Sequence, residues 1–126
     1  MATGTIIGES IRFGAALDGI PLTVRRIRRG GPAHLSPQQE ATGMPSHWTL
    51  IEFEIDDHDA PALASALADV LDDSGWYVDF RSPDETFVVF AGRVFRYRRG
   101  DERHRAEAEA YARARGVPTA QLDWPE

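Results

Sequence analysis

The 126-residue chain contains no cysteine, lysine or asparagine. Without cysteine it forms neither a disulfide framework nor a thiolate metal site, so a metal ion would need His and carboxylate ligands. No apolar run approaches the ~20 residues that a membrane-spanning helix needs, and the first residues lack the basic and apolar regions of a signal peptide. We therefore expect a cytoplasmic protein with no membrane partner.

Because lysine is absent, all fourteen basic residues are arginine. This composition is typical of a GC-rich coding sequence, which weakens a functional interpretation of any one arginine. The net charge of -6 is spread unevenly: residues 1–36 carry +3, residues 37–75 carry -9 and residues 76–126 are neutral. This pattern favours ion pairs within the fold over a charged docking surface. The acidic middle third also argues against a nucleic-acid partner, because it would repel a polyanion.

The length fits a single domain over residues 1–126. The Asp-Gly pair at residues 18–19 predicts a turn between two strands, and so an N-terminal hairpin over residues 5–28. Glycine and proline without periodicity predict a long flexible loop over residues 29–47. A strand follows at residues 48–56, with Glu52 and Glu54 on one face and its β-branched residues and Phe53 mainly on the other.

Two helices are expected from their caps and apolar spacing. Asp59 precedes a helix whose apolar stripe continues to the Ser-Gly pair at residues 74–75. Asp101 precedes a second helix, about residues 102–115, with three Arg/Glu pairs spaced four residues apart and a buried side made mostly of alanine. The tail after this helix is expected to fold back on its apolar residues. The sequence thus predicts an α+β fold of order β-β-β-α-β-β-β-α, with a mainly antiparallel sheet covered by two helices.

Residues 76–100 hold seven of the twelve aromatic residues and are divided by two turn signals, which predicts a three-stranded antiparallel meander. Counting outward from the turns places Phe80 opposite Phe87 and Val88 opposite Phe95. One face is then apolar and belongs to a core; it holds Trp76, Val78, Phe80, Phe87, Val89, Ala91 and Val94.

The other meander face mixes aromatic, acidic and basic side chains, and it is the main candidate site. Its candidate contact residues are Tyr77, Asp79, Arg81, Phe90, Arg93, Phe95 and Tyr97. If this face is exposed, its rings can stack on a planar ligand while its arginines bind an anion. The alternative is that the second helix or a sister subunit covers it.

Two further clusters have weaker patterns. Arg25, Arg26, Arg28 and Arg29 precede a glycine pair and are a candidate phosphate site, although basic side chains here can also pair with Glu52 and Glu54. The sequence IDDHD at residues 55–59 has metal-ligand residue types, but its spacing matches no known calcium loop or zinc site, so no metal is expected. No nucleophile and base stand in a catalytic pattern, so no catalytic residue and no cofactor are expected.

Several segments resemble one protein family. They read GESIRFGAALDGIPLTVRRI, WTLIEFE, GWYVDFRSPDETFVVFAGRVFRYRRGD and AEAYARARGVPTAQLDWPE. They are similar to a family of small, uncharacterised proteins from GC-rich actinobacteria, over most of the chain except residues 29–47. The resemblance implies a bacterial cytoplasmic setting. The family has no assigned activity, so the resemblance transfers no site residue.

Three functions stay open from the sequence. The first is a non-enzymatic binding or interaction module that forms a homo-oligomer, such as a dimer, through the second meander face or the sheet edge next to it. The second is phosphate or nucleic-acid binding through the arginines and aromatic rings. The third is a small-molecule enzyme with a pocket between sheet and helices, in which Tyr77, Asp79 or Glu52 would transfer protons.

Overall fold

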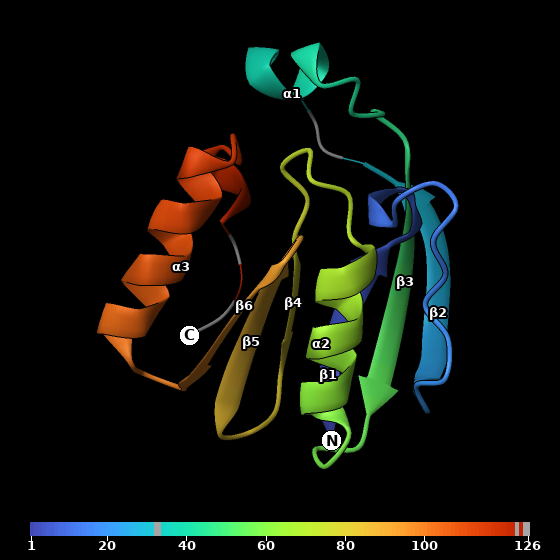
Figure 1. Ribbon diagram of the computed structural model, residues 1–126, viewed down its shortest axis with the longest axis vertical. Coiled ribbons are helices and arrows are strands. Elements are labelled where there is room, and N and C mark those ends of the chain that lie inside the picture. The colour runs from blue at the N-terminus through green and yellow to red at the C-terminus, as the bar shows by residue number, and fades with distance from the viewer. Residues whose placement is uncertain (32–33, 123, 125–126) are drawn as a thin grey trace.

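One six-stranded sheet with helices on both faces forms the fold (Figure 1). The computed structural model describes residues 1–31, 34–122 and 124. Its strands are β1 (Ala2–Ile7), β2 (Thr23–Gly30), β3 (Trp48–Ile55), β4 (Val78–Arg81), β5 (Glu85–Phe90) and β6 (Arg93–Arg98). Its helices are α1 (Pro37–Ala41), α2 (Ala60–Val70) and α3 (Glu102–Ala114), with 3-10 turns η1 (Gly8–Ser10) and η2 (Thr119–Gln121). The expected α+β class is confirmed. Within the described residues, no helix has the length and apolar content to cross a membrane.

The sheet order is β2-β3-β1-β4-β5-β6, and every neighbouring pair is antiparallel. The expected N-terminal hairpin is therefore wrong, because β3 lies between β1 and β2. β1 ends at Ile7, and residues 8–22 form η1 and a loop instead of two strand halves. The Asp-Gly pair does turn the chain, since Gly19 has a φ of 69°, but it turns a loop. Pairing with β3 and β4 buries Ile6 and Ala2, which a two-stranded hairpin could not do.

The segment expected to be a long loop contains the short helix α1. Ser36 caps this helix: its hydroxyl accepts from the backbone N–H of Gln39 at 3.1 Å, while the Gln39 side chain accepts from the Ser36 N–H at 2.9 Å. This reciprocal pair is a capping box, and Pro37 suits the first helical position. The flexibility of residues 29–47 stays a prediction, and residues 32 and 33 lie outside the described part.

The meander has the register that the sequence predicts. Phe80 pairs with Phe87 across β4 and β5, and Val88 pairs with Phe95 across β5 and β6. Two details differ from the expected core face. Val94 is 37% exposed at the last strand. Trp76 lies before the first residue of β4. The alternation of side chains along the strand therefore does not determine which sheet face Trp76 is on.

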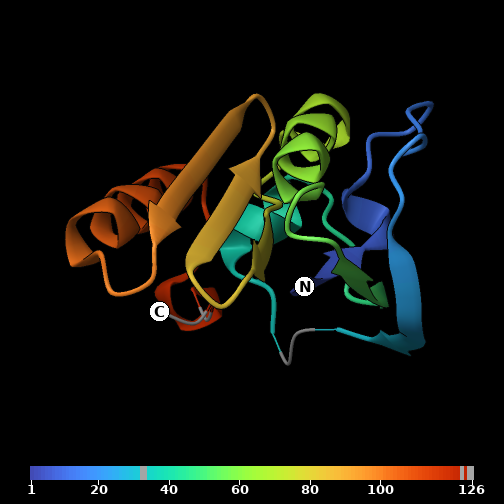
Figure 2. The same ribbon diagram turned by 90° about the horizontal axis from the view of Figure 1, so that it is seen from below.

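Two cores lie on opposite faces of the sheet (Figure 2). The first lies between α2 and the central strands and includes Ile6, Phe53, Leu63, Leu67, Phe80 and Val89. The second lies between α3, the C-terminal segment and the β5–β6 pair. It includes Val88, Phe90, Phe95, Tyr97, Ala108, Ala112, Val117, Leu122 and Trp124. The expected alanine face of the second helix and the folded-back tail are both confirmed.

The two long helices begin directly after the expected cap residues, but α2 ends at Val70, before the Ser-Gly pair at residues 74–75 that was expected to end it. The Asp101 side chain accepts from the N–H of His104 at 3.1 Å at the start of α3. This hydrogen bond and one with the His104 ring hold the pKa of Asp101 below its ordinary value. The expected pairs along α3 form, with Arg105 and Glu109 at 3.6 Å. Asp59 occupies the cap position of α2, but its side chain makes no capping hydrogen bond.

Candidate functional site

The second core covers only part of its sheet face, and the remaining part is a polar surface over β1 to β4. Strand register defines this surface. Thr5 on β1 pairs with Glu52 on β3, which in turn pairs with Arg26 on β2. On the other side of β1, Thr3 pairs with Arg81 on β4, and the same register places Asp79 beside Thr5. Four strands that are scattered along the chain thus bring their outward side chains onto one surface.

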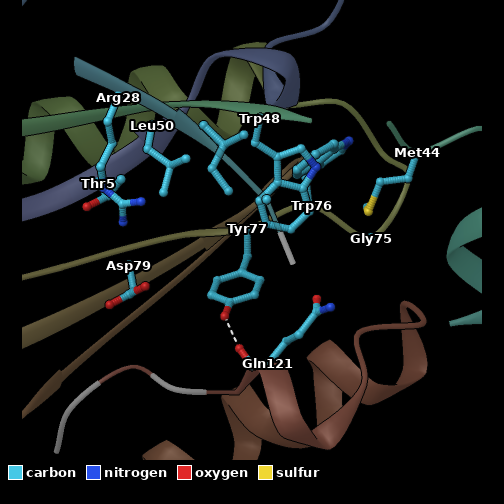
Figure 3. A pocket seen from close by; sticks show the side chains of 12 residues that line it. Thr5, Arg28, Met44, Trp48, Leu50, Gly75, Trp76, Tyr77, Asp79 and Gln121 are labelled. Carbon is cyan, nitrogen blue, oxygen red and sulfur yellow. Dashed lines mark hydrogen bonds between the residues drawn. The ribbon is translucent and has the colours of Figure 1, made fainter. Parts of the chain in front are cut away.

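A groove of about 450 Å³ lies on this surface (Figure 3). Its lining residues come from β1, β2, β3, β4 and three connecting segments: Thr5, Ile7, Arg28, Gly31, Met44, Trp48, Leu50, Gly75, Trp76, Tyr77, Asp79 and Gln121. The volume lies in the range typical of small-molecule sites, ~300–1,000 Å³. The lining is apolar toward Met44 and Trp76, and polar toward Thr5, Arg28 and Asp79 (Figure 3).

The apolar part of the groove is built around two tryptophans. The ring centroids of Trp48 and Trp76 lie 5.2 Å apart with the rings at 60°, an edge-to-face contact. The indole N–H of Trp48 donates to the carbonyl of Pro45 at 2.7 Å, which fixes the direction of the ring. Trp76 is 6% exposed and Trp48 is half-buried, so the groove is lined by ring surface that is already held in place.

Tyr77 forms the opposite wall together with the C-terminal segment. Its hydroxyl donates to the carbonyl oxygen of Gln121, as the dashed line in Figure 3 shows. The Gln121 side-chain oxygen accepts from the amide of Gln39 on α1 at 2.9 Å. Gln39 is itself buried, and it lies 82 residues from Gln121 in the chain. The segment that holds α1 and the C-terminal segment are therefore joined directly above the groove.

The polar end of the groove carries charges of both signs. Arg28 reaches from β2 to the neighbouring β3, and its Nε lies 3.4 Å from Glu52. Arg26 approaches the same carboxylate at 3.7 Å, and Arg25 contacts Glu54. These arginines thus pair with the carboxylates of β3, the alternative that the sequence left open for them. Exposed pairs of this kind contribute little stability, typically ~0–1 kcal/mol each.

The seven candidate contact residues are divided by the structure. Phe90, Phe95 and Tyr97 lie beneath α3 with 2%, 8% and 4% exposure, so at these three residues the second helix covers the face, the alternative that the sequence left open. Burial also raises the pKa of Tyr97. Arg93 is exposed at the edge of β6, with its guanidinium 4.6 Å from the centroid of Phe95.

The remaining candidates lie on β4 or directly before it. Tyr77 and Asp79 line the groove, and Arg81 follows them on the same uncovered face. Tyr77 links the two regions, because its ring also contacts Trp124 of the second core at 5.3 Å. The candidate residues that α3 leaves accessible are therefore those at β4, together with the exposed Arg93.

The acidic cluster at residues 55–59 has structural contacts. Asp56 accepts from the backbone N–H of His58 at 2.9 Å, and Asp57 pairs with the N-terminal amine at 3.0 Å. Within the described ranges, no three His, Asp or Glu side chains are grouped closely enough to hold a metal ion. Neither observation indicates a metal-dependent reaction at this turn.

Of the groove residues, the sequence indicated only Tyr77 and Asp79 as contact residues and Arg28 as a phosphate candidate. Trp48 and Leu50 share a strand face with Glu52 and Glu54, an apolar-to-acidic gradient that was visible in the sequence. Thr5 and Ile7 gave no signal, because their role depends on β1 lying between β3 and β4. Comparisons with protein-family models, curated proteins and solved structures returned no match to the chain.

Proposed function

We propose that this protein is a non-enzymatic binding module that holds a small ligand in the groove between β1–β4 and the α1 and η2 segments. The observation that carries this proposal is the groove itself, whose volume of about 450 Å³ is lined by Trp48, Trp76 and Tyr77 at one end and by Arg28 and Asp79 at the other. A site of this kind fits a ligand with a flat or apolar body and one polar end.

The lining favours binding over catalysis. Among the described residues that line the groove there is no His, Cys, Lys or Ser, so the acid-base groups of this lining are Tyr77 and Asp79. The Tyr77 hydroxyl already donates to the backbone of Gln121. The enzyme hypothesis keeps its pocket near Tyr77 and Asp79.

The structure gives less support to the other two hypotheses. Self-association stays a prediction, but Phe90, Phe95 and Tyr97 are beneath α3 and do not offer an interface. Phosphate binding through the β2 arginines competes with Glu52 and Glu54, which already contact three of them. Neither observation favours a second proposal.

The test uses the indole N–H signals of the three tryptophans in a nitrogen-correlated NMR spectrum of the full chain. Trp48 and Trp76 line the groove, whereas Trp124 is 1% exposed in the second core. Titration with indole-3-acetate, hexanoate and benzamidine covers an aromatic anion, an aliphatic anion and an aromatic cation. At least one probe should shift the Trp48 and Trp76 signals and leave Trp124 in place.

Two substitutions locate the binding site. Trp48→Ala should weaken the probe by about tenfold, because an aromatic contact of ~1.4 kcal/mol is lost. Phe13→Ala removes a fully exposed ring that is not part of the groove lining and should change nothing. The proposal fails if all three probes leave every indole signal unmoved, or if both variants bind the probe as the wild type does.

A further inference from the structure

The outer edge of β2 is the second surface that the fold leaves open. β2 stands at the end of the sheet order and pairs only with β3 among the described strands. Figure 2 shows it at the rim of the sheet, where the loop that leads from η1 into β2 also lies. Seven of its eight residues are exposed, from Thr23 to Arg29. An edge strand of this length presents a row of backbone N–H and C=O groups that another strand can pair with.

The two faces of this edge strand differ in chemistry. Val24 and Ile27 lie on the α2 side, opposite Phe53 and Ile51 of β3, and remain 45% and 63% exposed. Arg26 and Arg28 lie on the groove side. A bulge between Val24 and Arg26 interrupts the register. The regular part available for pairing is therefore Arg26–Gly30.

β3, the inner neighbour of β2, shows which side-chain sequence pairs with the side chains of β2. β3 has the sequence WTLIEFEI, in which Ile51 packs beside Ile27 while Glu52 contacts Arg26 and Arg28 on the other face. The side chains of an edge strand are shared between its two neighbours, and those of Ile27 and Arg26 are still more than half exposed. A second strand with alternating apolar and acidic residues would complete the cover on both faces.

We propose that the outer edge of β2 docks an extended segment of a partner protein with alternating acidic and apolar residues, which adds a seventh strand to the sheet. This mode is β-augmentation, in which backbone hydrogen bonds give affinity and alternate side chains give specificity. A second copy of β2 is a poor occupant, because antiparallel pairing would place the arginines of both copies on one face. The inference is independent of the ligand groove.

The probe is a synthetic peptide with the sequence of residues 48–55, WTLIEFEI, carrying a solubilising tag and a fluorophore. The matched control peptide replaces both glutamates with lysine. In fluorescence anisotropy with the full chain, the acidic peptide should bind, and added salt should weaken it because charge pairs contribute. The lysine peptide should bind at least about tenfold more weakly.

Two protein variants and an NMR map complete the test. Ile27→Asp should weaken the acidic peptide about tenfold, whereas Val94→Asp, at the opposite edge strand β6, should have no effect. Amide shifts should centre on β2. The proposal is overturned by equal binding of both peptides, by no binding, or by amide shifts that centre on β1 because the peptide has replaced β3. Wild-type self-association that Ile27→Asp abolishes would also overturn it, since the occupant would then be a second copy.

Discussion

Gly4 lies opposite Phe80 where β1 pairs with β4. A Cβ atom at this position would lie 2.6 Å from the carbonyl oxygen of Asp79 and 2.6 Å from Cβ of Phe80. Both obstacles belong to β4 or are fixed to it, so they cannot rotate away. The absence of a side chain at Gly4 therefore permits the contact that brings Thr5 and Asp79 together in the groove. The sequence showed a glycine in a strand but not which strand would approach it.

Gly4→Ala is expected to destabilise the protein by about 3 kcal/mol, the upper part of the range for an overpacked core. Gly8→Ala is the matched control, since its nearest neighbour would be Cβ of Thr49 at 3.4 Å, an ordinary contact. The measurement is the free energy of unfolding from urea titrations of both variants at one pH. Equal midpoints for the two variants would show that β1 and β4 separate easily at Gly4.

At the scale of elements, α3 determines which part of the second meander face is buried. Ala108 and Ala112 are fully buried against that face, and their small side chains let the helix approach Phe90 and Phe95. Tyr111 adds ring contacts to both phenylalanines, with centroids 4.8 Å and 5.4 Å away. The alanine spacing of α3 was visible in the sequence. The sequence did not show which sheet face α3 would cover, because either face could have accepted it.

Ala112→Asp is expected to release α3, because it places an unpaired carboxylate in the second core. The expected loss is about 3 kcal/mol in unfolding free energy. Ala110→Asp, on the exposed side of the same helix, should stay within about 0.5 kcal/mol of the wild type. The readouts are urea unfolding and binding of an apolar dye, which should rise only in the first variant. Wild-type stability of Ala112→Asp would contradict the packing of α3.

At the scale of the whole molecule, β5 connects the two cores. Val88 faces α3 and Val89 faces α2, and both are fully buried. The edge strand β2 and the short helix α1 lie away from this centre, and most of their residues are exposed. Stability should therefore be distributed unequally along the chain, with the greatest protection where both cores meet.

Native-state hydrogen exchange should follow this arrangement. Amides of β5 and its neighbour β4 should exchange only through global unfolding, and amides of β2 and α1 should exchange by local opening orders of magnitude faster. Mass spectrometry of peptides from a timed exchange series measures both. Similar protection for β2 and β5 would contradict the expected hierarchy, and fast exchange in β5 would contradict the central position of that strand.

The sequence alone determined features that depend on neighbours along the chain. Turn residues and strict alternation defined the meander register, and cap residues with helical spacing defined α2 and α3. Only the tertiary structure decided that β1 lies between β3 and β4, and that α3 covers the face predicted to be a contact surface. The physical reason is that hydrogen bonds between strands are the same for every antiparallel partner. The choice of partner comes from burying Ile6, Phe53 and Phe80 together, a property of the whole core.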